Sequence, residues 1–541
     1  MPFWPKAEAL DPLTRLFAYL DDMYIVCSRD ASLAVLCALE EALNAAGLKL
    51  NPTKTNSWCP LGVQGIPPTL PGGRCNTLKV LGGALKKPGH AEDEPVAAHG
   101  AGTALEETTQ RLARFWDKLK GTGLSKQKTA ALLRTYAGAS SQHALRLEKA
   151  SQQQADAYDA QLLTCWSDLL ERPLTEDSLD RLGLPLKLGG LGLQLARTRR
   201  NAAPWSSWAA TLEGVASDLG YEVLEDFLAA LPHLKAELEE LRTGLVTQGA
   251  GVPPEAALGA ALKKAGKQKN LVVDIQRKTK KSLEASMDVD GKADFRTAAG
   301  PGAGAFMLYP VDPDCELENP LWATTARRRL GLDRPEAGAA ELGSVATNCC
   351  NRTAQGSLCG AFLDAKGRHA AACACAGGRL RKHGRLARAV AGLARRWYDA
   401  APSLEQRIPE LDYRKPDGSI KHAIMDIVVP FLGRRELIDV TVRQGAAGSA
   451  EHRLAASRRD GVPSRRAEQK KHARYPTREL VAFAVEGCGR LGGEARAWLK
   501  RGAYSQLGDF QVAELTRAHR VVSAAVQGET ARALRAAAGL R

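Results

Sequence analysis

The sequence lacks the features that mark membrane-spanning and secreted, disulfide-bonded proteins. It has no run of about 18 apolar residues, the length needed to cross a bilayer. Its start, Met1 to Lys6, has no basic stretch followed by an apolar one, as a secretory signal would. Twelve cysteines among 541 residues are too sparse for a disulfide scaffold, and no internal repeat is visible. These absences predict a soluble intracellular protein with no membrane partner.

What the chain does have is length and positive charge. With 541 residues and 44% hydrophobic content it can bury several cores, so we expect a multidomain α+β protein of about three or four domains. The formal net charge of +15 favours a polyanionic partner, because each Lys or Arg set against a phosphate releases a condensed counterion. Nucleic acid is therefore the leading partner, and simple solubility is the alternative explanation of the charge.

Two short apolar runs near the N-terminus flank the turn Tyr19-Leu20-Asp21-Asp22. A hairpin here would hold Asp21 and Asp22 side by side, and adjacent carboxylates ionise together readily only when a cation neutralises them. This is half of a two-metal site for phosphoryl transfer. The third carboxylate would come from a strand before the hairpin, and no upstream segment is long enough to supply it.

Further along, the sequence alternates between compact and open segments. Helical spacing of leucines predicts a helix over 31–46, and a short strand follows at 78–83. Residues 105–245 are mostly helical, interrupted at 184–193 by glycines that permit a tight turn. Residues 247–304, rich in Gly, Ala, Pro and Lys, are predicted to form a basic and partly mobile linker.

Five cysteines and a histidine gather between residues 349 and 375. Thiolates and an imidazole at such spacing favour a tetrahedral Zn²⁺ site, and a His-x3-Cys step can present two ligands from one helical turn. All four positions would be filled by protein, which indicates structural rather than catalytic zinc. Cys349 and Cys375 are substitutes, and chance clustering is the alternative. The predicted ligands are Cys350, Cys359, His369 and Cys373.

Two later runs, 423–430 and 435–442, read as apolar strands with one central acid each, Asp426 and Asp439. Paired as a hairpin, they would bring these acids together. A carboxylate on a strand of Ile and Val is costly unless a metal or a base satisfies it. Lys471 downstream could stabilise a phosphate under attack, which completes a set of groups for metal-assisted phosphodiester hydrolysis.

Alternatives remain open at these positions. Asp417 follows a proline in a polar turn and competes with Asp426, which we favour because its strand is apolar. Lys470 could replace Lys471. Ordinary surface aspartates on edge strands would explain the two acids without any chemistry.

The order of these features resembles the C-terminal part of non-LTR retrotransposon proteins. The segment from Tyr19-Leu20-Asp21-Asp22 onward resembles their reverse transcriptases, in which Asp21 and Asp22 match the metal-binding pair and Lys54 matches the lysine of the next palm motif. The glycine-rich segment 184–193 resembles the thumb. The string from Cys359 to Tyr475 resembles the zinc knuckle and restriction-like endonuclease of site-selective elements.

The resemblance also implies roles for residues of the nuclease. Asp426 and Asp439 would hold Mg²⁺ or Mn²⁺, and Lys471 would assist at the phosphate. Glu405 would be a helix-borne acid, and Tyr475 a supporting residue.

His383 matches a basic-histidine signature of the family, with DNA contact or structural support as its implied role. The usual Arg-His-Asn of that signature stands here as Lys382-His383-Gly384.

The implied activity is nicking of double-stranded target DNA in the nucleus, after which the freed 3′-hydroxyl primes copying of the element RNA. Because the fingers and the first catalytic aspartate have no counterpart, we expect an incomplete polymerase site, in a fragment or a decayed copy. The alternative is a noncatalytic, zinc-containing remnant that binds nucleic acid. The implied domains are a partial palm (1–95), an all-α thumb (100–245), a basic linker (246–335), a small zinc module (336–380), an α/β restriction-like (PD-(D/E)xK) endonuclease (381–510) and a C-terminal helix (511–541).

Overall fold

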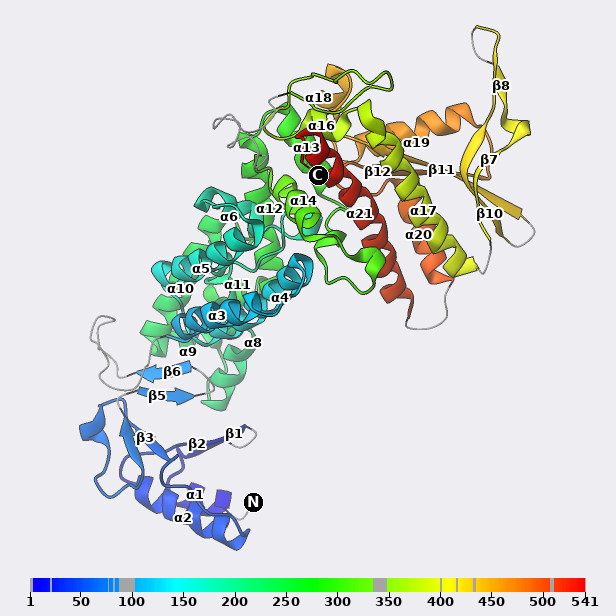
Figure 1. Cartoon of the computed structure of the whole chain (residues 1–541). Helices are drawn as coiled ribbons and strands as arrows, with labels where there is room; N and C mark the ends of the chain where they lie inside the picture. Colours follow the sequence, from blue (N-terminus) through cyan, green and yellow to red (C-terminus); the bar gives the residue numbers. More distant parts are fainter. Residues whose placement is uncertain are drawn as a thin grey trace. The chain divides into compact units, whose positions relative to one another are not determined.

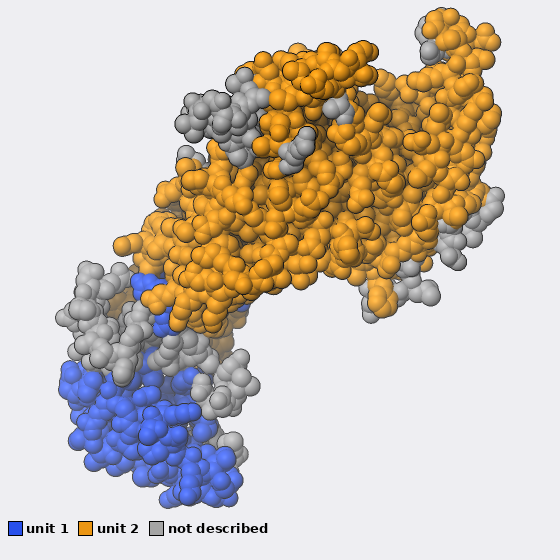
Figure 2. All heavy atoms as spheres, in the orientation of Figure 1, with its two compact units in different colours: residues 1–108, 144–150 blue, residues 109–143, 151–541 orange. Residues whose placement is uncertain are grey.

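The computed structural model describes residues 3–19, 22–75, 77–80, 83–86, 103–333, 348–398, 401–414, 417–431, 434–505 and 510–540. It is a mixed α+β structure, as expected from the sequence, and it divides into two compact units (Figure 2). Unit 1 comprises residues 1–108 and 144–150, and unit 2 comprises 109–143 and 151–541. Among the described residues, every helix is too short or too polar to cross a bilayer.

Unit 1 holds the predicted N-terminal hairpin. β1 and β2 pair antiparallel with Tyr19 opposite Asp22, so Asp22 begins β2, while Asp21 lies outside the described residues. The predicted helix at 31–46 is α2, which packs on α1 through Ala7, Val35 and Leu39. The elements are α1 (Phe3–Leu10), β1 (Arg15–Tyr19), β2 (Asp22–Val26), α2 (Ser32–Ala45), β3 (Asn56–Trp58), β4 (Gly73–Cys75), β5 (Thr77–Val80) and β6 (Gly83–Lys86).

The predicted helical region is present. Its glycine-rich interruption is a turn fixed by a buried arginine, since Arg329 donates to the carbonyls of Gly190, Ala303 and Leu186. A Cβ at Gly190 would lie 2.1 Å from the Leu184 carbonyl oxygen, so only glycine fits there. The helices are α3 (Ala104–Lys120), α4 (Lys126–Leu147), α5 (Gln152–Leu170), α6 (Glu176–Gly183), α7 (Ala196–Arg199), α8 (Ala202–Asp218), α9 (Leu224–Ala230) and α10 (Pro232–Gln248).

The prediction of a linker over residues 246–335 is wrong. This region folds into helices α11 (Leu258–Lys264), α12 (Gln268–Ser286), α13 (Val289–Ala298) and α14 (Asn319–Leu330). Their apolar positions recur at helical spacing, and residues such as Leu262 and Ile275 are buried in the core formed with α8 and α10. The lysines that suggested a solvated linker occupy the outer faces of these helices.

The C-terminal part of unit 2 is built on a four-stranded sheet with the order β12-β11-β10-β7. β10 pairs antiparallel with both β7 and β11, whereas β11 and β12 run parallel. The elements are α16 (Arg368–Ala372), α17 (Gly378–Tyr398), β7 (Ser403–Arg407), β8 (Tyr413–Arg414), β9 (Ile420–Lys421), β10 (Ile424–Phe431), β11 (Arg434–Arg443), α18 (Ala450–Arg458), α19 (Val462–Arg474), β12 (Leu480–Glu486), α20 (Gly493–Tyr504) and α21 (Phe510–Ala537).

One face of this sheet carries the main core. Ile427, Val429, Ile438 and Val440 pack with the apolar sides of α17, α20 and α21. The predicted C-terminal helix is α21, which lies beside α17 (Figure 1). Because side chains alternate along a strand, the positions between these residues face the other side of the sheet.

Candidate active site and metal centre

The two predicted strand acids lie together on the face opposite the main core. In the β10–β11 register Ile427 faces Ile438, so the next pair outward is Asp426 and Asp439. Residues directly opposite in an antiparallel pair have their Cβ atoms about 5 Å apart on the same face. The two carboxyls accordingly interact with each other directly.

Asp439 is the more buried of the pair, with 5% of its side chain exposed, and it forms an ion pair with the Lys471 ammonium from the last turn of α19. Burial raises the pKa of the Asp439 carboxyl to about 6, against the opposing effect of Lys471 and with the help of the Asp426 charge. A carboxylate held in this way would ionise more readily beside a cation.

Asp426 is held by two donors. Its Oδ2 lies 3.1 Å from His383 Nε2 and accepts a 2.7 Å hydrogen bond from the Val440 backbone N–H. Burial is the largest single influence on Asp426 and opposes its ionisation, but the bond and charge of His383 together with the bonds to Asp439 and the Val440 N–H lower the pKa of Asp426 overall. The same bond raises the pKa of His383. His383 is therefore the hydrogen-bond partner of Asp426, whereas the sequence left its role between DNA contact and structural support.

The other predicted nuclease residues fall into two groups. Tyr475 is buried directly after α19, and its ring meets that of Tyr413 edge-on, with the ring centroids 6.2 Å apart. Glu405 is not borne on a helix as predicted: α17 ends at Tyr398, and Glu405 is an exposed residue of β7 with a left-handed φ of 51°. Its place in the register is opposite Asp426.

The two open alternatives are resolved by position. Asp417 lies in an exposed turn, where its carboxylate accepts from the backbone and hydroxyl of Ser419. Lys470 is exposed, whereas Lys471 reaches Asp439. The geometry therefore brings together Asp426, Asp439 and Lys471.

A second cluster is a candidate metal centre of three cysteines and one histidine. The four ligand atoms all lie within 4.8 Å of one another. The sulfur of Cys373 lies 3.8 Å from those of Cys349 and Cys359, and Cys359 Sγ lies 3.4 Å from His369 Nε2. A tetrahedral zinc with Zn–S of about 2.3 Å requires S···S edges of about 3.8 Å and S···N edges of about 3.5 Å. The cluster has the dimensions to hold zinc.

The surroundings of these thiols affect their ionisation differently. Burial raises the pKa of Cys349 to about 12. Burial also opposes ionisation of Cys373, but hydrogen bonds from Asn351 and from neighbouring groups lower the pKa of its thiol. Burial raises the pKa of Cys375, which lies beside Cys359 and Cys373, to about 11. Soft thiolates together with one imidazole form a ligand set suited to zinc.

The predicted ligand Cys350 is replaced by its neighbour Cys349. Residues 348–352 and 358–362 pair as a short antiparallel ribbon, in which successive side chains point to opposite sides. Cys349 faces the cluster. Cys350 instead faces the end of α21, where its backbone N–H donates to Ala537 and its sulfur would lie 3.9 Å from a Cβ at Gly539.

Asp364, to which the sequence assigned no role, holds the backbone of His369. Both oxygens of Asp364 accept backbone N–H groups at the start of α16, those of Arg368 at 3.0 Å and His369 at 2.9 Å. Asp364 lies three residues before the N-cap Gly367, a position that the usual capping pattern does not reveal.

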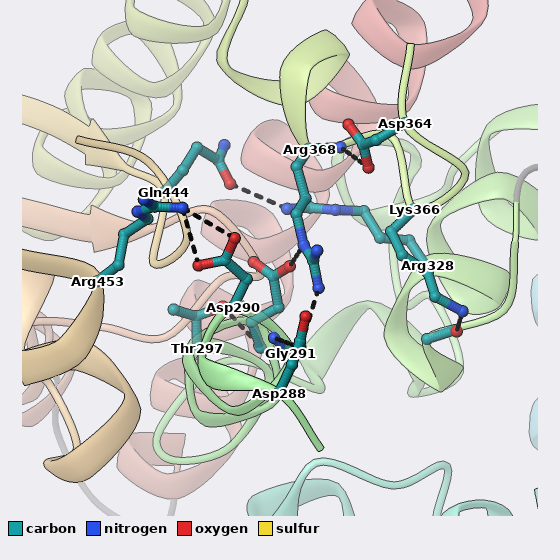
Figure 3. A network of polar contacts seen from close by, with 12 residues as sticks. Asp288, Asp290, Gly291, Thr297, Arg328, Asp364, Lys366, Arg368, Gln444 and Arg453 are labelled. Carbon is teal, nitrogen blue, oxygen red and sulfur yellow. Dashed lines mark hydrogen bonds and ion pairs between the residues drawn. The ribbon is translucent and has the colours of Figure 1, made fainter. Parts of the chain in front are cut away.

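An ion-pair network around Arg368, the neighbour of His369, joins α16 to other parts of unit 2 (Figure 3). Arg368 donates to Asp294 at 2.9 Å and lies 3.7 Å from Asp288, both acids belonging to the α13 region. Arg453 of α18 pairs with Asp290 at 3.0 Å. Burial raises the pKa of Asp294, although its arginine partners oppose the shift. The metal centre is thus packed as an integral part of the unit.

The two sites meet along α17. Lys382, of which 4% is exposed, donates a 2.8 Å hydrogen bond to the Ala371 carbonyl at the end of α16. Burial lowers the pKa of Lys382 to about 8. The next residue, His383, bonds Asp426. With consecutive side chains, α17 therefore contacts α16, which carries His369, and Asp426 of the carboxylate pair.

Taken together, these residues offer two kinds of metal chemistry. The Cys349, Cys359, His369 and Cys373 cluster leaves no open position and suits a structural ion. The paired carboxylates with an adjacent ammonium suit a hard, oxygen-seeking cation and a phosphate. No family model matches the chain, and no curated protein gives a significant match to it.

Proposed function

We propose that this chain is the C-terminal part of a non-LTR retrotransposon protein and that its β10–β11–α19 site is a metal-dependent DNA endonuclease. The observation that carries the proposal is the placement of Asp426 directly across from Asp439, with Lys471 against Asp439. The two carboxylates lie on one face of the sheet, and Lys471 reaches that face from α19. These are the three residues to which the resemblance gives the catalytic roles.

In this mechanism the protein groups divide the work. Asp426 and Asp439 would hold Mg²⁺ or Mn²⁺, and His383 would fix the orientation of Asp426. A bound divalent cation polarises the phosphate and lowers the pKa of a coordinated water. Lys471 neutralises charge that develops on the phosphate oxygens as water attacks the phosphorus. The P–O3′ bond breaks, which leaves a 3′-hydroxyl and a 5′-phosphate.

The remaining parts take the roles implied by the same resemblance. The Cys3His cluster is a structural zinc knuckle beside the nuclease. The β1–β2 hairpin with Asp22 is a partial reverse transcriptase palm, and the helical region is its thumb. The partners are double-stranded target DNA and the element RNA, and the place of action is the nucleus. The net charge of +15 supports polyanionic partners.

The test is nicking of supercoiled plasmid by the purified, zinc-loaded chain with Mg²⁺. Lys471→Met removes the ammonium beside Asp439, and Lys470→Met is the matched control because Lys470 is exposed and adjacent on the same helix. We expect the Lys471 variant to lose at least about 100-fold in nicking rate, the scale seen when a single charge-stabilising group is removed. The Lys470 variant should keep its rate.

Equal nicking by both variants, or nicking that survives in EDTA, would contradict the nuclease assignment. If the parent chain binds DNA in a salt-dependent way but does not nick it, the result would instead favour the noncatalytic binding remnant.

A further inference from the structure

A fifth thiol lies against the metal centre without being needed as a ligand. Cys349, Cys359, His369 and Cys373 already supply four ligand atoms, the number that a tetrahedral zinc takes. Cys375 follows Cys373 by two residues and packs against the same cluster of buried residues as Cys359. Its thiol interacts with those of Cys359 and Cys373. A filled tetrahedral site leaves this sulfur without a coordination position, so Cys375 is a surplus thiol.

The backbone that carries Cys375 is a short connection between two helices. α16 ends at Ala372 and α17 begins at Gly378, and Cys375 opens the single turn η5 (Cys375–Gly377) between them. The turn closes at Gly377, whose left-handed φ of 65° glycine adopts without strain. Two sulfurs must come to about 2.05 Å to form a bond. Because Cys375 lies outside both helices, its backbone can adjust to that distance without breaking their hydrogen bonds.

The sulfurs of the cluster differ in how easily a solute reaches them. Cys349 and Cys373 are buried, with 1% and 6% of each residue exposed, whereas Cys359 and Cys375 are partly exposed. An oxidant in solution therefore meets Cys359 and Cys375 first. Of these two, Cys359 is a ligand, and a ligand sulfur is held as the thiolate, which is the form that reacts with oxidants.

Cys350 is a second surplus thiol, but it lies on the other side of the ribbon. It is next to Cys349 in sequence and is partly exposed, as Cys375 is. Its sulfur donates to the Asn348 backbone carbonyl at 3.7 Å, and its backbone N–H donates to Ala537 at the end of α21. Cys350 is thus directed away from the ligands, while Cys375 lies beside two of them.

We infer that the metal centre is also an oxidation site, at which a hydroperoxide converts Cys359 and Cys375 into a disulfide. The Cys359 thiolate attacks one oxygen of hydrogen peroxide, the O–O bond breaks, and hydroxide leaves, so that Cys359 becomes a sulfenic acid. The Cys375 sulfur then attacks the Cys359 sulfur, and the S–O bond breaks. The hydroxyl group leaves with the proton of Cys375 as water. The two sulfurs together lose two electrons, which the peroxide gains.

This disulfide would remove one of the four ligands of the centre. A site reduced to two thiolates and one imidazole binds zinc more weakly, so the ion is released. A thiol reductant regenerates both cysteines, which makes the loss reversible. The inference depends on the zinc site and not on the carboxylate pair, so it goes beyond the proposed nuclease.

The experiment treats the zinc-loaded full chain with hydrogen peroxide. A colorimetric chelator follows zinc release, and mass spectrometry of nonreduced peptides identifies the disulfides. Cys375→Ser removes the surplus thiol beside the ligands, and Cys350→Ser is the matched control. We expect a disulfide between Cys359 and Cys375 in the parent chain and in Cys350→Ser, and both should regain their zinc after reductant and zinc are added.

In Cys375→Ser the sulfenic acid of Cys359 has no resolving thiol beside it. It should proceed to the sulfinic acid, which thiol reductants do not reverse, so the zinc regained should be at least about fivefold lower than in the parent. Cys375→Ala should give the same result. Before oxidation both variants should hold as much zinc as the parent, because Cys375 is not a ligand.

Three results would overturn the inference. Loss of zinc from the unoxidised Cys375 variants would make this residue a ligand. A parent disulfide that joins Cys373 to Cys349 or to Cys359 would make Cys375 a bystander, as would full recovery of zinc by Cys375→Ser. Release of zinc without any disulfide would exclude the second step. All of these measurements are made without DNA, so failure of the nuclease proposal leaves their outcome unaffected.

Discussion

The Asp439→Asn variant tests how ionisation of Asp439 affects the free energy of unfolding and, separately, whether Asp439 is needed for Mg²⁺ binding and nicking. Burial raises the Asp439 pKa from 3.8 to about 6, so the folded chain keeps this proton up to about pH 6 while the unfolded chain loses it near pH 3.8. A shift of about two pKa units corresponds to about 3 kcal/mol. The free energy of unfolding should therefore fall by about 3 kcal/mol as pH rises from below 3.8 to above 6, and then level off.

About 1.4 kcal/mol of this fall lies between pH 5 and pH 7.5. The asparagine of the Asp439→Asn variant cannot ionise, so the variant should not show this fall. The difference in the free energy of unfolding between variant and parent should therefore grow by about 1.4 kcal/mol, in favour of the variant, from pH 5 to pH 7.5. Urea unfolding of both zinc-loaded proteins without Mg²⁺ measures this difference, and the metal centre contributes equally to both.

Binding of Mg²⁺ should raise the free energy of unfolding, whereas ionisation of Asp439 lowers it. At 100 times its dissociation constant, a cation that binds only the folded chain adds about 2.7 kcal/mol, which is close to what ionisation of Asp439 takes away. Below pH 6 the cation must displace a proton, so its apparent affinity should fall by up to tenfold per pH unit. Asp439→Asn should lose this stabilisation together with more than about 100-fold in nicking rate.

Thermal melting with and without Mg²⁺, together with plasmid nicking, tests the whole argument. If Asp439→Asn shows the same pH dependence, the same Mg²⁺ stabilisation and the same nicking rate as the parent, Asp439 is not a metal ligand and the reasoning fails.

Three further substitutions test other parts of the structure. Cys349→Ser should reduce bound zinc from about one equivalent to near zero by elemental analysis, whereas Cys350→Ser should keep it, and the reverse result would restore Cys350 as the ligand. His383→Gln should slow nicking about 10- to 100-fold, the scale for a group that orients a metal ligand, without releasing zinc; an unchanged rate would reduce His383 to a bystander. Gly190→Ala should destabilise the helical region by about 3 kcal/mol or more because its Cβ meets backbone oxygens. The control Gly214→Ala, within α8 and with open space around it, should melt slightly higher than the parent because alanine favours a helix over glycine by about 1 kcal/mol. A Gly190→Ala variant that melts like the parent would show that the turn can adjust.

The carboxylate pair could be predicted because its signal is local. Alternating apolar residues identify the strands, and an acid in the middle of each is unusual enough to be noticed. A short connection then makes the hairpin the natural pairing, which places Asp426 across from Asp439. Lys471 was found through the order of motifs, since nothing in its own helix distinguishes it from Lys470.

The choice between Cys349 and Cys350 could not be made from sequence. It depends on which side of the 348–352 ribbon faces inward, and that is set by pairing with residues 358–362. A shift of one residue in such a ribbon exchanges the two faces.

Glu405 and the supposed linker were misread for a related reason. Residues 403–407 have no apolar alternation and become a strand only by pairing with β10. In 246–335, abundant Gly, Ala and Lys hid the four-residue spacing of Leu258 and Leu262 in α11 and of Leu271 and Ile275 in α12, which composition alone cannot reveal.

Because Lys382 and His383 are consecutive on α17, this helix connects α16 to Asp426. His383 lies about 7.5 Å along the axis from the first residue of the helix, and Lys382 precedes it on the same backbone. A displacement of α16 that reached α17 through the Lys382–Ala371 hydrogen bond would therefore also shift His383 relative to Asp426.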